Sequence, residues 1–158
     1  MALAEKSKAP TFTASTDGDG VFSLKQAKGH WLVLYFYPKD DTSGCTAQAC
    51  DFRDSMARIT SAGAMVVGVS PDGVKSHNKF KTKYDLPFAL VSDEDHTICQ
   101  AYDTWKEKSM YGRKYMGVER TTYIIDPKGV IRKTFEKVSV KGHVDAVIAE
   151  LAQLGATM

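Results

Sequence analysis

The sequence of 158 residues lacks most of the features that mark specialised classes of protein. Its longest apolar run, residues 31–37, is far shorter than the roughly 20 residues that a membrane-spanning helix needs. The net charge is only +2 and no basic run is present, so a nucleic-acid-binding surface is not expected. The first residues contain no apolar segment of the kind found in secretory signals. We therefore expect a cytoplasmic protein whose partners include neither a membrane nor a nucleic acid.

Cysteine is also scarce, and the three thiols are Cys45, Cys50 and Cys99, so the sequence has no Cys-x-x-Cys motif. An odd number of cysteines in a reducing compartment favours a catalytic or redox role over a framework of structural disulfides. The four histidines are scattered, and the Cys45-x₄-Cys50 spacing is not joined to a second pair of ligands as in zinc sites. The sequence also lacks a glycine-rich phosphate-binding loop. We expect neither a metal nor a bound cofactor.

The rest of the composition, 43% hydrophobic and 25% charged, is typical of a soluble globular protein. We place a single domain at residues 1–158, because no linker, repeat or low-complexity segment divides the chain. Hydrophobic periodicity and turn residues predict an N-terminal hairpin (11–14 and 21–24), buried strands (31–37, 64–70 and 88–91), a strand pair (119–125 and 130–135) and helices (43–62, 74–84, 95–102 and 144–154). Residues 104–117 show no clear period, and we interpret them as a loop. This order predicts an α/β protein of thioredoxin-like fold, with a mixed central sheet and helices on both faces.

One stretch combines a buried strand, a turn and the start of a helix around a cysteine. The strand ends at Pro38, which lacks the N–H that a central strand needs, and Thr42 or Ser43 can cap the following helix. The helix is predicted by positions that recur on one face, namely Cys45, Ala49, Phe52, Met56 and Ile59. Cys45 is thus expected on the inward face of the first turn, where free N–H groups and the helix dipole favour a thiolate. Taken alone, however, a buried cysteine is more often a small core residue than a nucleophile.

The motif Pro38-x-x-x-Thr42-x-x-Cys45 reverses that balance, because it resembles the active-site motif of the peroxiredoxins. The longer string Tyr-Pro-Lys-Asp-Asp-Thr-x-Gly-Cys-Thr, followed by Cys-Asp-Phe-Arg-Asp, resembles the bacterioferritin comigratory protein (PrxQ) branch. The resemblance extends over most of the chain. Ser43 stands where the branch commonly has proline, and Gln48 where it commonly has glutamate. Both differences leave the thiol and the threonine in place.

The resemblance implies a peroxidase that reduces hydrogen peroxide and small organic hydroperoxides, contributes to antioxidant defence and is a monomer. It implies that Cys45 is the peroxidatic cysteine, which becomes a sulfenic acid. Thr42 is then expected to hydrogen-bond the peroxide, Pro38 to shield the thiolate from solvent, and the backbone N–H groups of Gly44 and Cys45 to donate to the peroxide oxygen. It also places Arg120 beside the thiolate, where a guanidinium suits both the sulfur and the peroxide. Without the resemblance, Arg120 would be interpreted as a surface charge at the end of a strand.

The resemblance further implies a second thiol that resolves the sulfenic acid. Cys50, five residues after Cys45, is the candidate, and thioredoxin or a similar dithiol would reduce the resulting Cys45–Cys50 disulfide. Some relatives carry the resolving cysteine in the next helix, but residues 74–84 contain no cysteine here. Without Cys45 nearby, Cys50 would be interpreted as a small residue on a helix face. Cys99 matches no motif and is expected to serve packing.

Two other functions remain compatible with the sequence. A dithiol–disulfide carrier fits the fold class but normally uses the Cys-x-x-Cys motif that is lacking here. A redox-sensing or holdase protein would use the oxidised state as a signal. Consumption of peroxide coupled to oxidation of thioredoxin distinguishes the peroxidase from both.

Overall fold

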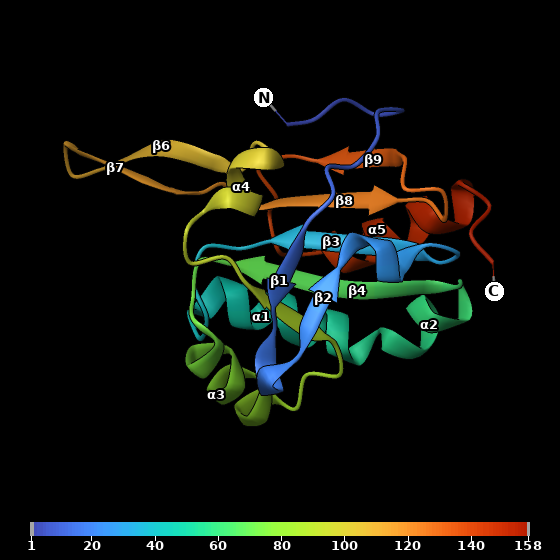
Figure 1. Ribbon diagram of the computed structural model, residues 1–158, viewed down its shortest axis with the longest axis horizontal. Coiled ribbons are helices and arrows are strands. Elements are labelled where there is room, and N and C mark those ends of the chain that lie inside the picture. The colour runs from blue at the N-terminus through green and yellow to red at the C-terminus, as the bar shows by residue number, and fades with distance from the viewer. Residues whose placement is uncertain (1, 158) are drawn as a thin grey trace.

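The computed structural model describes residues 2–157 and is built around a five-stranded mixed sheet (Figure 1). The strands are β3 (Trp31–Phe36), β4 (Ala64–Ser70), β5 (Ala89–Ser92), β8 (Thr121–Ile125) and β9 (Ile131–Phe135), in the spatial order β5-β4-β3-β8-β9. β3, β4 and β5 are parallel, β8 is antiparallel to β3, and β9 is antiparallel to β8. The mixed sheet expected from the sequence is confirmed.

The sheet is covered on both faces, and its central strand divides its side chains between them. The helices are α1 (Ser43–Asp54), α2 (Met56–Ser61), α3 (Val74–Tyr84), α4 (Thr97–Ala101) and α5 (His143–Gln153). Val33 and Tyr35 of β3 pack into one core with side chains of α1, α2, α3 and α5. Leu32 and Leu34 pack into the other with α4 and the N-terminal segment. Because successive side chains of a strand point to opposite faces, a strand buried on both sides is apolar throughout, as residues 31–36 are.

The N-terminal segment forms the predicted hairpin, which crosses the second face of the sheet (Figure 1). β1 (Thr13–Ser15) and β2 (Val21–Ser23) pair antiparallel. The short 3₁₀ helix η1 (Asp17–Asp19) lies between the two strands, and a second one, η2 (Leu24–Ala27), follows β2. Phe22 and Leu24 are buried against the sheet. The hairpin thus takes the place of a helix layer on much of this face.

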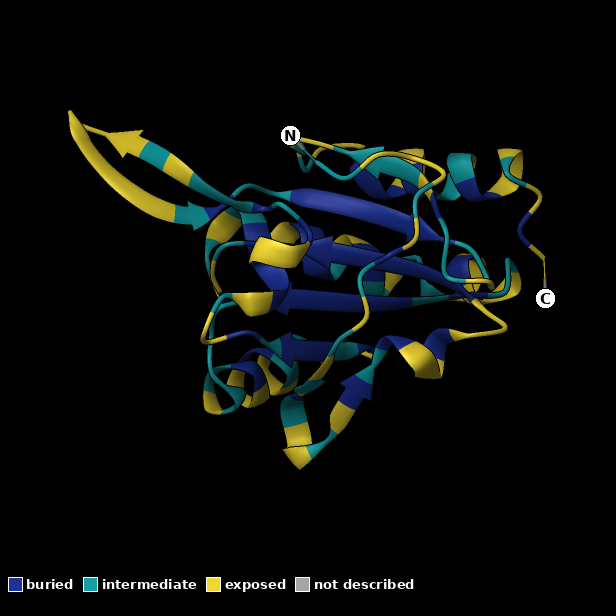
Figure 2. Cartoon of the chain, turned by 45° about the horizontal axis from the view of Figure 1, so that its top comes forward, coloured by how far each residue is buried: buried dark blue, intermediate teal, exposed yellow. Residues whose placement is uncertain are grey.

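The interpretation of residues 104–117 as a loop was wrong. They belong to β6 (Trp105–Met110) and β7 (Arg113–Val118), which pair antiparallel and form an arm that projects from the sheet (Figures 1 and 2). Most side chains of this β6–β7 arm are exposed or half-buried, and Tyr111 at its tip is 98% exposed. A strand pair that buries neither face needs no alternation of apolar and polar residues, so the arm left no period in the sequence.

The other predicted elements agree with the structure within two residues at each end, with one exception. The helix expected over residues 43–62 is divided at Ser55, where α1 ends and α2 begins. None of the helices in residues 2–157 is long and apolar enough to cross a membrane.

Candidate active site

Cys45 lies at the carboxyl end of β3, in the first turn of α1. It is the third residue of that helix and its exposed fraction is only 1%. Its neighbours on the inward face, Ala49 and Phe52, belong to the same core. The residues 38–42 that connect β3 to α1 are called the active-site loop below. The strand end, the loop and the helix start together bring the thiol to an edge of the sheet, where parallel strands place functional groups.

Arg120 is brought to this thiol from a distant part of the sequence. It directly precedes β8, whose first residue, Thr121, pairs with Phe36 at the end of β3. The Nη2 of Arg120 donates to the Sγ of Cys45 at 3.3 Å, and its Nη1 donates to the Oε1 of Gln48 at 2.6 Å. The antiparallel register of two strands thus sets a permanent positive charge beside the sulfur.

Gly44 makes this approach possible. A Cβ atom at this position would lie 3.2 Å from the Nη2 of Arg120, closer than an ordinary van der Waals contact. A larger residue would therefore require the guanidinium to shift by a few tenths of an ångström. Gly44 is half-buried, and its N–H belongs to the first turn of α1.

Thr42 occupies the N-cap position of α1, but the expected side-chain cap was wrong. Its backbone is extended, with φ −96° and ψ 159°, and its hydroxyl donates to the carbonyl oxygen of Lys39 at 2.9 Å instead of accepting from the helix. Thr46 N donates to the carbonyl of Thr42, which starts the helix ladder. No side chain in residues 2–157 caps the first turn. The N–H groups of Gly44 and Cys45 consequently remain available to an oxygen atom placed beside the sulfur.

The remaining predicted residues lie at different distances from this centre. Pro38 is half-buried in the active-site loop, two residues after β3 ends. Cys50 lies on the same helix as Cys45 and is half-buried. Cys99 is fully enclosed in the opposite core, where burial and the nearby carboxylate of Asp93 raise the pKa of its thiol. Such a thiol is packing material rather than a nucleophile.

Sequence reasoning missed polar groups that surround the thiol. The Oη of Tyr35 and the Nε2 of Gln48 are buried and have no hydrogen-bond partner within residues 2–157. Burial, and then the charge of Cys45, raise the pKa of Tyr35. Lys108, in the middle of β6, has a pKa lowered by burial and by the charge of Arg120. An uneven pattern of basic residues in residues 104–117 was the only sequence signal for Lys108, and Tyr35 could not be distinguished from the other apolar and aromatic residues of its buried strand.

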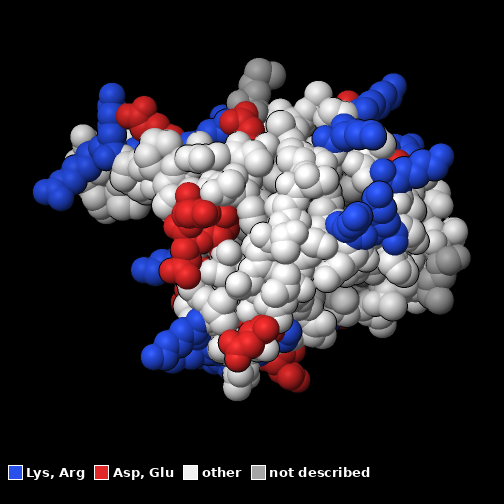
Figure 3. Space-filling view, in the orientation of Figure 1, with Lys and Arg blue, Asp and Glu red and all other residues white. Residues whose placement is uncertain are grey.

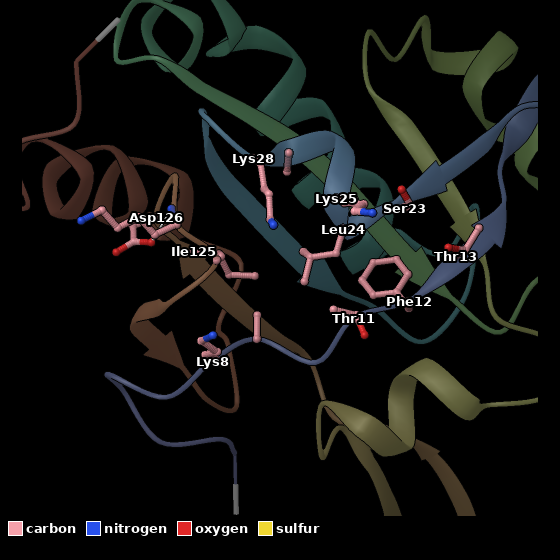
Figure 4. A pocket seen from close by; sticks show the side chains of 14 residues that line it. Lys8, Thr11, Phe12, Thr13, Ser23, Leu24, Lys25, Lys28, Ile125 and Asp126 are labelled. Carbon is pink, nitrogen blue, oxygen red and sulfur yellow. Dashed lines mark hydrogen bonds between the residues drawn. The ribbon is translucent and has the colours of Figure 1, made fainter.

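A cavity of about 520 Å³ lies at the other end of the sheet (Figure 4). Its lining includes Leu24 and Ile125, and Ile125 pairs with Leu32 near the start of β3. Basic side chains gather on this side of the molecule and on the β6–β7 arm (Figure 3). None of the predicted site residues lines the cavity, so its volume does not mark the reacting centre.

The structure also brings together residues that the sequence leaves apart. Asp40, Asp72 and His77 carry atoms of the kind that ligate metals within 4.8 Å of one another. The sequence alone did not indicate that His77 would lie beside two carboxylates. These three residues already hydrogen-bond to their neighbours, with 2.7 Å between the Nδ1 of His77 and the Oδ2 of Asp40. The atoms of these three residues that could ligate a metal thus already take part in hydrogen bonds within the protein.

Comparison with known proteins shows to which family the chain belongs. The AhpC/TSA family matches residues 6–134. Peroxiredoxin Bcp of Xanthomonas campestris is 47% identical over 137 residues, which cover 87% of this chain and 86% of that one. Peroxiredoxin Bcp of Bacillus subtilis is 45% identical over 147 residues, which cover 93% of this chain and 94% of that one.

A solved structure extends the similarity from sequence to fold. Peroxiredoxin Q of Xanthomonas campestris superimposes with a TM-score of 0.86 at 45% identity, with 90% of each chain covered. The thioredoxin-like fold expected from the order of elements is confirmed by this match. The chain therefore belongs to the AhpC/TSA family and, within it, to the Bcp or peroxiredoxin Q peroxiredoxins, which makes it a peroxidase of the oxidoreductase class.

Proposed function

We propose that this peroxidase reduces hydrogen peroxide and small organic hydroperoxides at Cys45. The observation that carries the assignment is the guanidinium of Arg120, whose Nη2 lies 3.3 Å from the Sγ of Cys45 at the start of α1. A permanently charged donor at this distance stabilises both a thiolate and the charge that develops on a departing oxygen. The bacterioferritin comigratory protein of Xanthomonas campestris, similar in structure, has an alkyl peroxide reduction activity, which supports the same class of substrate here.

In the first step, the thiolate of Cys45 attacks one oxygen of the peroxide and the O–O bond breaks. The sulfur loses two electrons and becomes a sulfenic acid, while the other oxygen takes up a proton and leaves as water or an alcohol. The N–H groups of Gly44 and Cys45, together with Arg120, supply donors for the oxygens. Thr42 keeps acceptor capacity on its Oγ1 and can receive the O–H of the hydroperoxide. Pro38 limits access of water to the thiol.

In the second step, the thiolate of Cys50 attacks the sulfur of the sulfenic acid. A disulfide forms, and the hydroxyl leaves as water after taking up a proton. Cys45 and Cys50 lie on one uninterrupted helix, α1 (Ser43–Asp54). Five residues of an α-helix rise about 7.5 Å and rotate by about 140°, whereas a disulfide needs Cα atoms within about 7 Å and side chains that face each other. The first turns of α1 must therefore unwind before the disulfide can form.

In the third step, thioredoxin or a similar dithiol protein reduces the disulfide. Thiol–disulfide exchange transfers two electrons from the donor and restores both thiols. Cys50 is half-buried rather than enclosed, which leaves one sulfur of the pair open to an attacking thiol once α1 unwinds. We propose that the cycle runs in the cytoplasm, in a monomer, and that it serves antioxidant defence and redox homeostasis.

Mass spectrometry after one equivalent of hydrogen peroxide tests these roles. The wild-type chain is expected to contain a Cys45–Cys50 disulfide and a free Cys99. Cys50→Ser is expected to consume one equivalent of peroxide and then to stop as a sulfenic acid on Cys45, with thioredoxin as reductant. Cys99→Ser is the matched control and should turn over at nearly the wild-type rate. Steady turnover by Cys50→Ser, or a Cys45–Cys99 disulfide, would contradict the role of Cys50.

A further inference from the structure

Both ring nitrogens of His77 face hydrogen-bond acceptors. His77 is fully buried on α3, with its Nε2 2.9 Å from the carbonyl oxygen of Val91 and its Nδ1 2.7 Å from the Oδ2 of Asp40. A carbonyl oxygen can only accept, so the Nε2 must carry a hydrogen. The neutral ring has only one N–H, which leaves a lone pair on Nδ1 opposite the carboxyl group. A further proton must therefore lie between His77 and Asp40.

The surroundings of Asp40 place that proton on the ring. The hydroxyl of Tyr37 donates to the Oδ1 of Asp40 at 2.6 Å, and the hydroxyl of Ser76 donates to its Oδ2 at 2.8 Å. With His77, three donors converge on one carboxyl group, which is the arrangement that an ionised carboxylate prefers. Burial opposes a charge on His77, but the hydrogen bond and the charge of Asp40 outweigh it and raise the pKa of His77. Below the raised pKa of His77, the pair is an imidazolium facing a carboxylate.

This pair fastens the active-site loop to the body of the protein. Asp40 lies in the middle of the loop, and its backbone N–H also donates to the Oδ2 of Asp72 at 2.8 Å. The next residue, Asp41, has a left-handed backbone with φ 57° and accepts hydrogen bonds from Lys83 and Tyr84 of α3. The buried pair is the part of this attachment that water does not screen. Thr42 and the first turn of α1 follow directly.

We propose that Asp40 and His77 form a proton-sharing pair that positions the active-site loop, and with it the first turn of α1, for the reaction of Cys45 with peroxide. Both are positioning residues, because they act through the loop. The proposal rests on the proposed role of Cys45, but the state of the pair can be measured without reference to peroxidase activity.

A bound metal ion is the competing explanation for the same cluster. Asp72 joins Asp40 and His77 in offering ligand-type atoms within 4.8 Å of one another. However, the Oδ2 of Asp72 already accepts from Asp40 N and from the hydroxyl of Ser70 at 2.7 Å. A cation would have to displace the proton between His77 and Asp40 and break these bonds. The hydrogen-bond pattern favours the proton.

The pair has a defined pH dependence. The titratable or charged groups around His77 are Tyr37 directly after β3, Asp40 in the active-site loop and Asp72 after β4. The cavity outside Asp40 is also lined by Asp41, Lys75, Lys79 and Lys83. Because the pKa of His77 is raised above the usual 6.5, the pair is intact below about pH 6.5 and loses its proton as the pH rises through the raised value. Above that value the Nδ1 lone pair of His77 faces the carboxylate of Asp40, and the loop is held less firmly.

An NMR titration of the His77 Cε1–H resonance tests the shared proton directly. The wild-type midpoint is expected above 6.5, and Asp40→Asn should move it downward because the negative charge is gone. His30 is exposed and serves as the internal reference for comparing the two proteins. A wild-type midpoint at or below 6.5 would overturn the proposal. So would a stoichiometric shift of the His77 signal by Zn²⁺ that Asp40→Asn abolishes, because it would identify a metal site.

Peroxide reduction against pH tests the positioning role. Asp40→Asn is expected to reduce kcat/KM for hydrogen peroxide several-fold below the wild-type His77 midpoint, and to remove the part of the profile that follows this midpoint. His77→Asn should behave in the same way, since its amide keeps a donor to Asp40 without the titration. His77→Ala should lose more activity, and His30→Asn, the control, none. A profile in Asp40→Asn that is parallel to the wild type would overturn the proposal. If Cys45→Ser retained activity while the NMR result held, the role of Cys45 would fail and the pair would stand.

Discussion

Cys45 and Cys99 occupy the same position in their helices but have opposite surroundings. Each is the third residue, of α1 and of α4, and each is enclosed, with 1% and 0% exposed. In α4 the first turn is occupied by a carboxylate: the N–H groups of Ile98 and Cys99 donate to Asp93 at 3.0 and 2.7 Å. In α1 no side chain caps the first turn, and the guanidinium of Arg120 lies beside the sulfur instead.

The difference teaches that a helix start does not by itself activate a thiol. Burial and the carboxylate of Asp93 raise the pKa of Cys99, so that this thiol stays protonated and unreactive. Free N–H groups and a guanidinium at Cys45 have the opposite effect on a developing charge. The group that fills the first turn decides whether the cysteine serves packing or chemistry.

The largest effect is expected when the thiol of Cys45 is removed. Cys45→Ser should reduce turnover of hydrogen peroxide by on the order of 10³-fold or more, because a hydroxyl does not supply the nucleophile. Cys99→Ser is the matched control and should change turnover little. Peroxide consumption coupled to thioredoxin oxidation measures both. Substantial turnover by Cys45→Ser would show that the reacting thiol is elsewhere.

The next effect concerns the charge beside the sulfur. Arg120→Met should slow peroxide reduction by about 10²-fold or more, because the charge on the departing oxygen loses its strongest donor. The rate of Cys45 alkylation, followed across a pH range, should also fall. Arg132→Met, at an exposed position of β9, is the control. An unchanged alkylation profile would assign the cation to Lys39 or Lys108 instead.

Much of this comparison could be predicted from local sequence patterns. The apolar run of β3, the break at Pro38 and the helical spacing after Cys45 each depend on residues close in the chain, and the structure contains all three. The proximity of Arg120 was expected only from the family resemblance. It depends on the pairing of Thr121 with Phe36, and the register of strands distant in sequence leaves no local periodicity.

The rest required three-dimensional contacts. The hydroxyl of Thr42 donates to the carbonyl of Lys39 rather than accepting from the helix, and a threonine hydroxyl can form either kind of local bond, so the sequence does not decide between them. The bond between His77 and Asp40 joins residues 37 positions apart. The β6–β7 arm is stabilised by backbone pairing and buries little, so side-chain patterns did not reveal it.

A smaller effect is expected from a change beside Cys99. Asp93→Asn removes a buried carboxylate whose two oxygens accept from the first turn of α4, and the amide can replace only one of them. The free energy of unfolding should fall by about 1–3 kcal/mol in urea titrations, while peroxide turnover at 25 °C stays near the wild-type rate. Asp95→Asn is the exposed control, since Asp95 lies at the surface and accepts from Thr97 N. A loss of turnover without a loss of stability would place the α4 region in the catalytic cycle.

The smallest effect is expected for Gln48→Glu, a substitution that makes the surroundings of Cys45 more like those of Cys99. The Oε1 of Gln48 accepts from the Nη1 of Arg120, and its Nε2 is buried without a partner in the described chain. Gln48→Glu would place a carboxylate beside the guanidinium with almost no change of shape, as Asp93 lies beside Cys99. The new negative charge would offset part of the field that Arg120 exerts on the sulfur.

Because Arg120 stays in place in Gln48→Glu, the rate of Cys45 alkylation, followed across a pH range, and the rate of peroxide reduction should each fall by less than about tenfold. The free energy of unfolding should not fall, since the change removes an unpaired buried donor and adds a charged partner to Arg120. Gln100→Glu, at an exposed position of α4, controls for the added charge. An unchanged alkylation profile would mean that the charge of Arg120 does not reach the sulfur. A loss as large as that of Arg120→Met would mean that the carboxylate draws the guanidinium away from Cys45, so that distance rather than net charge sets the reactivity.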